Sequence, residues 1–332
     1  MFEPPQPRPA PAELIRGLAV LAEPPTHEHP RIVEALGLGP PPSAVEYSDL
    51  FLFQLYPYAS VHLGAEGMMG GEAQARVAGF WQALGYEPPA EPDHLSALLG
   101  LYASLSEAAR PHAKQAAGPT AKEGAGPQDT TTAHRRLVEQ SARALLEEHL
   151  APWVFAFLTR VSELSAGVYR RWAELLEVTL REELRRGAAA TDDTAATDDA
   201  AATDVLPLHL RLAPTLPDPR ESGATAFVSG LLAPVRAGFV LTRADVATMA
   251  ARCDLGLRAG ERRYALEHLL AQDGRAVLDA LASEARRQGD LHEARAPWLG
   301  STATFLAGRA HDSASLLRSL AAEEPAGAEA AS

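Results

Sequence analysis

The chain has 332 residues, a formal net charge of -13 and a single cysteine. The negative charge argues against a nucleic-acid backbone or an anionic membrane as the main partner and favours a cationic one. Cys253 can form no internal disulfide, so a reducing compartment fits, and we expect a cytoplasmic protein. The sequence has neither the roughly 18 consecutive apolar residues of a membrane span nor the pattern of a secretory leader.

Composition divides the chain into distinct parts. Residues 1–42 combine a proline-rich arm with a short helix over 14–21, and residues 43–187 carry apolar residues at helical spacing. Three parts follow: an acidic low-complexity linker that repeats Ala-Ala-Thr-Asp-Asp (188–204), a smaller and mainly helical accessory unit (205–321) and a disordered tail (322–332). The predicted organisation is therefore a main helical domain tethered to a second unit.

Helix signals dominate the main domain. Ser43 and Glu46 form a capping box, which predicts a helix from about residue 44. Further helices are predicted over residues 72–84, 93–109, 133–150, from 152 onward and 168–186, with a loop over 118–132. The predicted fold class is all-α, a single helical bundle followed by a smaller helical unit.

The accessory unit gives weaker signals. Residues 206–219 are predicted to be extended, and residues 227–239 fit either a short helix or a loop. Three helices are predicted beyond them, over residues 242–253, 260–272 and 274–287. Near the N-terminus, His27 and His29 lie in a proline-rich loop, where solvent-exposed side chains are more common than a metal site.

The segment from Glu91 to His94 stands directly before a leucine-rich helical stretch. Proline suits the first turn of a helix, and acidic side chains there face the positive end of the helix dipole. In the structural interpretation, Glu91 or Asp93 caps this helix and His94 is a partly buried first-turn residue. Composition alone favours this interpretation over a binding role.

A series of motifs resembles a known family. Residues 47–51, 57–63 and 79–84, the segment Glu91-Pro-Asp-His-Leu95 and the later element Glu148-His-Leu-Ala-Pro-Trp153 resemble the TorD/DmsD/NarJ family of cytoplasmic chaperones for molybdenum-containing redox enzymes. The resemblance covers roughly residues 43–186. The chain is longer than the usual single bundle of this family, and the unit after Asp204 has no counterpart in its short members.

The resemblance implies a system-specific chaperone, not an enzyme, with no cofactor or metal of its own. It would bind the twin-arginine leader peptide and the apo form of a molybdopterin-containing catalytic subunit and assist cofactor insertion and maturation. Asp93 would offer the carboxylate that an arginine fork pairs with. The residues expected to bind the client or its leader are Glu91, Pro92, Asp93, His94, Tyr58, Trp81, Glu148, His149 and Trp153.

An enzyme interpretation has less support. Di-iron helical bundles need two Glu-x-x-His pairs and two further glutamates, whereas the chain offers only the pair from Glu91 to His94. His311-Asp312 resembles a dipeptide of metal-dependent phosphohydrolases, but the other ligands of that pattern have no obvious counterpart. The alternative that remains is a helical metal-dependent hydrolase using His94 and His149.

Overall fold

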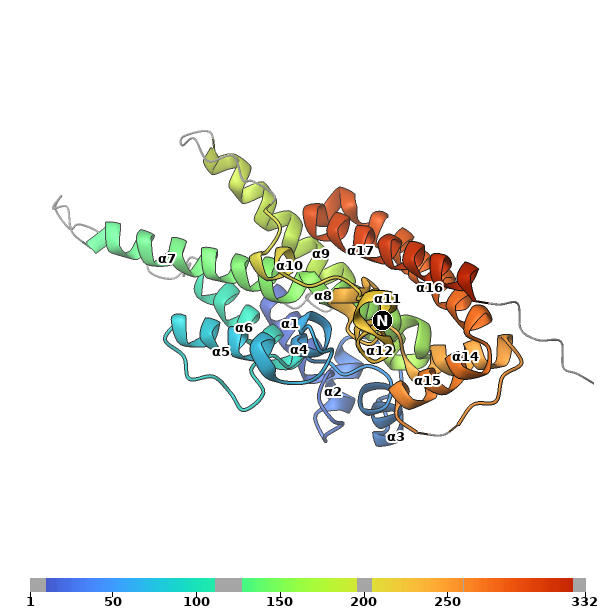
Figure 1. The fold of residues 1–332 in the computed structure, drawn as a ribbon. Coiled ribbons are helices and arrows are strands. Elements are labelled where there is room, and N and C mark those ends of the chain that lie inside the picture. Colours follow the sequence, from blue (N-terminus) through green and yellow to red (C-terminus); the bar gives the residue numbers. More distant parts are fainter. Residues whose placement is uncertain (1–9, 111–126, 196–204, 259, 325–332) are drawn as a thin grey trace, which may run out of the picture.

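The computed structural model describes residues 10–110, 127–195, 205–258 and 260–324. All regular elements of these residues are helices, and an isolated bridge between Tyr58 and His94 is the only β-type pairing among them (Figure 1). The predicted all-α fold class is therefore confirmed. Within the same residues, no helix is both long enough and apolar enough to cross a membrane.

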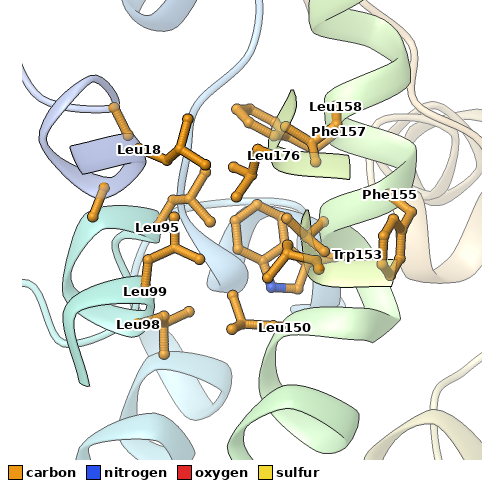
Figure 2. Close-up of a cluster of buried hydrophobic side chains, with 14 of the residues drawn as sticks. Leu18, Leu95, Leu98, Leu99, Leu150, Trp153, Phe155, Phe157, Leu158 and Leu176 are labelled. Atoms are coloured by element: carbon orange, nitrogen blue, oxygen red, sulfur yellow. The ribbon is translucent and has the colours of Figure 1, made fainter. Parts of the chain in front are cut away.

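Helices α1 to α9 build the larger hydrophobic core. Their bounds are α1 Pro11–Val20, α2 His29–Ala35, α3 Ala44–Tyr47, the π-helical η1 Ser48–Leu52, α4 Ala59–Leu63, α5 Gly71–Ala83, α6 Leu95–Ala108, α7 Pro127–Ala144, the π-helical η2 Leu145–Leu150, α8 Ala151–Leu164 and α9 Gly167–Ala195. In Figure 2, Leu18 of α1 and the leucines of α6 face Trp153 and Leu150 across this core. The apolar period of the sequence correctly placed α6 and α8 in the interior.

The N-terminal helix is part of the same core. Ile15 and Leu18 of α1 are completely buried, and the indole N–H of Trp172 on α9 donates to the carbonyl of Leu18 at 2.9 Å. Val33 of α2 is also buried there. The described part of residues 1–42 thus packs with the bundle, while the division of the chain into separate units stays a prediction.

Two stretches that we predicted to be irregular are partly helical. Helix α7 begins at Pro127, inside the predicted loop 118–132, and α9 continues to Ala195, inside the predicted linker 188–204. Proline is favourable at the first position of a helix, and alanine has the highest helix propensity, so both extensions have a local reason. The rest of that loop and of that linker, and the proline-rich arm 1–9, lie outside the described residues.

The C-terminal elements build the second core, and some of their residues, such as Leu210 and Val235, belong to the larger one. These elements are α10 Leu208–Arg211, α11 Pro219–Ser222, α12 Ala224–Leu231, α13 Pro234–Ala237, α14 Arg243–Arg252, α15 Arg262–Gln272, α16 Gly274–Glu293 and α17 Ala296–Glu323. Helices α16 and α17 lie side by side (Figure 1). Sequence analysis predicted the helices now labelled α14 to α16 but missed α17, which bends at Gly300 and includes the first residues of the predicted tail 322–332.

A buried arginine joins the two cores. Arg160 of α8 is 4% exposed and forms ion pairs with Glu163 of its own helix, with Asp245 of α14 and, at 3.8 Å, with Glu284 of α16. Arg287 of α16 contacts Glu163 and Glu284 as well. A buried arginine and partly buried carboxylates thus connect α8 with α14 and α16.

Replacing Arg160 by alanine should lower the free energy of unfolding by about 1.5–3 kcal/mol, because its partly buried carboxylate partners would lose their charge-assisted hydrogen bonds. The exposed pair Arg170 with Glu174 on α9 is the matched control, and Arg170→Ala should cost about 0.5 kcal/mol or less. Equilibrium urea unfolding measures both values. Equal losses in the two variants would contradict a stabilising role for the Arg160 network.

Candidate functional site

The segment Glu91 to His94 pairs with the segment that enters α4. The N–H of Leu95 donates to the carbonyl of Pro57 at 2.8 Å, and the N–H of Ala59 donates to the carbonyl of Asp93 at 2.9 Å. These bonds give the bridge between Tyr58 and His94. Two stretches that are more than thirty residues apart in sequence are thereby held side by side.

Asp93 has no exposed surface, and its Oδ2 accepts a hydrogen bond from the N–H of Ser60 at 2.9 Å. Ser60 lies in the first turn of α4, so the carboxylate caps α4 rather than the helix that follows it. The cap interpretation of Asp93 is therefore corrected, while its binding to a client stays a prediction. Asp93 does not cap its own helix, and in this structure its carboxylate is not accessible to an arginine of a client.

Ser60 extends this connection to the next loop. Its Oγ accepts a hydrogen bond from the N–H of Gly70 at 3.1 Å, in the glycine-rich turn before α5. Met68 and Met69 of that turn are exposed. The Asp93 carboxylate thus supports, directly or through Ser60, both the start of α4 and the loop that carries the two methionines.

The N-cap of α6 is His94. Its Nδ1 accepts from the N–H of Ser96 at 3.2 Å and lies 2.6 Å from the Ser96 Oγ, which also donates to Glu23. Burial lowers the pKa of His94, although the nearby carboxylates of Glu23, Glu91 and Asp93 oppose this shift. His94 is more deeply buried than predicted, at 4% exposure.

Glu91, Tyr58 and Trp81 form the outer face of the segment. Glu91 is exposed, and its Oε2 accepts from the hydroxyl of Tyr58 at 2.9 Å. The half-buried Trp81 donates its indole N–H to the carbonyl of Pro92 at 3.3 Å, and its ring meets that of Tyr86 edge-on. A carboxylate beside aromatic rings is an arrangement suited to a guanidinium group.

The second sequence element lies in the π-helical turn η2. His149 and Trp153 are both buried, and the Trp153 indole donates to the His149 carbonyl at 2.8 Å, whereas Glu148 is exposed. The ring of His149 packs on Phe80 of α5, with centroids 4.7 Å apart. Since Phe80 precedes Trp81, helix α5 contacts both elements, which places them around one helix.

The expected site residues therefore fall into two layers. Pro92, Asp93, His94, His149 and Trp153 are buried, while Glu91 and Glu148 are exposed and Tyr58 and Trp81 lie between. Sequence analysis did not identify Glu23, Ser60, Phe80 or Ser96 as members of the site. None of these four carries a motif signal, because only the fold brings them to the segment Glu91 to His94 or to η2.

The two histidines of the alternative hydrolase do not share a ligand group. Among the described residues, one set of three potential metal ligands lies together, comprising Asp290, Glu293 and His311. It is at the surface between α16 and α17, and the Nε2 of His311 lies 3.1 Å from Asp290 Oδ1. Neither His94 nor His149 belongs to it.

Residues 39–159 match the model of a family described as nitrate reductase delta subunit. Residues 39–159 are thus similar to the NarJ/TorD-like chaperone family. The match covers about a third of the chain and contains the whole segment Glu91 to His94 and the element Glu148 to Trp153. It leaves out α1, α2, the end of α8, all of α9 and the elements that follow. No curated protein and no solved structure matches the chain.

In this stretch, Asp93→Ala should lower the free energy of unfolding by about 1–3 kcal/mol, because the buried N–H of Ser60 would lose its acceptor. Asp93→Asn keeps an acceptor oxygen and should lose clearly less. Chemical denaturation of both variants checks the difference. Equal stability of the alanine and asparagine variants would contradict the proposed cap on α4.

The buried histidines should make the protein less stable in acid. Burial lowers the pKa of His62 and His149 to about 4, from 6.5, with Arg262 and Arg76 respectively adding to the shift. As the pH falls from about 6.5 to 4, the unfolded chain takes up these protons before the folded one, so the free energy of unfolding falls across that window.

The variant His149→Leu tests this dependence. Its unfolding should take up about one proton fewer near pH 5 than that of the wild type, which gives a flatter plot of unfolding free energy against pH. Urea unfolding at several pH values between about 7 and 4 measures the slope. The exposed His134→Leu is the control. Identical slopes for His149→Leu and the wild type would contradict burial of a neutral His149.

Proposed function

We propose that this chain is a cytoplasmic chaperone for a molybdopterin-containing oxidoreductase. It would bind the twin-arginine leader and the apo form of the catalytic subunit and assist cofactor insertion and maturation. The match to a family of redox-enzyme maturation chaperones supports the general role. The observation that carries the leader-binding part is the exposed Glu91 carboxylate, which is held by Tyr58, next to the Pro92 carbonyl that accepts from Trp81.

The outer face of the site has the chemistry that a cationic peptide requires. An exposed carboxylate can accept two parallel hydrogen bonds from an arginine fork, and adjacent aromatic rings attract the same cation. The hydrogen bond from Tyr58 fixes the Glu91 side chain before a ligand arrives, which reduces the entropy lost on binding. The chain's net charge of -13 adds long-range attraction for a positively charged leader.

The buried layer supports this face without touching the ligand. Asp93 and His94 fix the backbone directly after Pro92, and Trp81 donates to the Pro92 carbonyl. Glu148 would provide a second exposed carboxylate on the η2 side of α5. In this proposal the chaperone shields its client until the cofactor is inserted, so it needs neither a catalytic group nor a cofactor of its own.

Glu91→Gln tests the proposal directly. The charge-assisted hydrogen bonds to a leader arginine contribute roughly 1.5–3 kcal/mol, so the affinity for a synthetic twin-arginine peptide should fall about ten- to a hundred-fold. The melting temperature should barely change, because the side chain is exposed. Fluorescence anisotropy with a labelled peptide measures the affinity.

Two controls accompany this measurement. A peptide with both arginines replaced by lysine should bind the wild type more weakly, because lysine cannot form the bidentate contact. Glu267→Gln removes an exposed charge on α15 and should leave the affinity unchanged. Equal binding of the arginine and lysine peptides, together with no effect of Glu91→Gln, would rule out arginine recognition at this face.

A further inference from the structure

A second carboxylate reaches the same site from outside the family-matched stretch. Glu23 follows α1, and its side chain is 47% exposed. The Ser96 hydroxyl donates to its Oε1, which lies 3.5 Å from the Nδ1 of His94. The loop after α1 thus brings an acidic group to the start of α6, more than seventy residues away in sequence.

A buried histidine fixes the loop that carries Glu23. His29 is 1% exposed, its Nδ1 accepts from the N–H of Thr26 at 3.0 Å, and its Nε2 lies 3.3 Å from the carbonyl of Glu23. With Nδ1 as acceptor, the neutral ring donates through Nε2, and burial lowers the pKa of His29 accordingly. The predicted exposure of His29 is therefore wrong: this side chain clamps the turn.

Glu23 and Glu91 approach the same rings. Both carboxylates act electrostatically on His94. Burial raises the pKa of Tyr47 to about 12, and the charges of Glu23 and Glu91 add to this shift. Glu23 reaches His94 through Ser96, and Glu91 reaches it through Tyr58, whose ring meets that of His94 with centroids 4.8 Å apart. Two carboxylates therefore border one aromatic group.

Both carboxylates remain available to a cation. Many glutamates of the chain pair with arginine, as Glu163, Glu174 and Glu267 do. Among the described residues, neither Glu23 nor Glu91 lies within ion-pair distance of an arginine or lysine. His94 supplies little compensating charge, because burial favours its neutral form. A ligand with two adjacent cations offers a partner to each carboxylate.

We propose that Glu23 and Glu91 form a two-carboxylate site for paired guanidinium groups, in which each arginine of a twin-arginine segment binds one carboxylate. His29 is the positioning residue for Glu23. This inference rests on the proposed function and adds a residue from outside the family match. It explains why a pair of arginines, rather than a single one, would be recognised.

Synthetic leaders with citrulline test the assignment, because citrulline keeps the shape of arginine but has no charge. Four peptides carry arginine or citrulline at each of the two positions, and they are titrated against wild type, Glu23→Gln and Glu91→Gln. Each glutamine variant should lower the affinity for the unmodified leader about ten- to a hundred-fold. Each should also become insensitive to citrulline at one position only, and the position should differ between the two variants.

Glu28→Gln is the matched control, because Glu28 is an exposed acidic residue of the same loop, and its affinity should equal that of the wild type. If Glu91→Gln lowers the affinity for the leader and Glu23→Gln does not, the two-carboxylate site is overturned while the proposed function stands. Insensitivity of both variants at the same arginine would overturn the two-carboxylate site in the same way. Failure of the wild type to bind any leader would overturn both proposals.

The role of His29 is tested in two backgrounds. His29→Ala should lower leader affinity in the wild type but have no further effect in Glu23→Gln, whereas its effect on stability should be the same in both. His29→Gln keeps a donor and an acceptor and should recover part of the affinity. A further affinity loss from His29→Ala in the Glu23→Gln background would show that His29 does not act through Glu23.

Discussion

The buried carboxylate of Asp93 and its hydrogen bond to the Ser60 N–H connect the parts on which the site depends. A buried polar group is unfavourable unless it is hydrogen-bonded, so the fold keeps this contact wherever it keeps Asp93 inside. Through Ser60 the contact extends to Gly70, and through the Asp93 carbonyl it extends to Ala59. Glu91 lies at the surface, two residues before Asp93, whose hydrogen bonds with Ser60 and Ala59 fix the backbone.

Local signals in the sequence predicted the elements that depend on local interactions. The capping boxes of Ser43 with Glu46 and of Thr242 with Asp245 are present, and the leucine period of α6 faces the core. Such local patterns do not predict which residues far apart in the sequence come into contact. The donor that satisfies Asp93 lies thirty-three residues away, so the helix that follows was wrongly assigned its cap. His29 was misjudged for the same reason, since the turn around it buries a ring that composition places in solvent.

Helix ends were predicted less well than helix interiors. Helices α7, η2 and α8 follow one another without a gap, although Pro152 indicated a new start. Proline has no N–H to donate to the carbonyl four residues earlier, and the preceding turn η2 has π-helical geometry. Helix α17 was missed because its alanine-rich sequence has little amphipathic contrast and bends at Gly300. Sequence analysis identified the residues of the family motif, but it did not predict which of them are buried and which are exposed.

The division of the motif into a buried and an exposed layer bears on what the motif does. Asp93, His94 and Trp153 hold backbone and helix starts in place, so changes there alter the shape of the face rather than its chemistry. Glu91 lies inside the family-matched stretch and Glu23 outside it. If both carboxylates bind one ligand, one of the two contacts lies in the family-matched stretch and the other lies in the loop after α1. That loop is held by His29 and not by Asp93, so the two contacts can change independently.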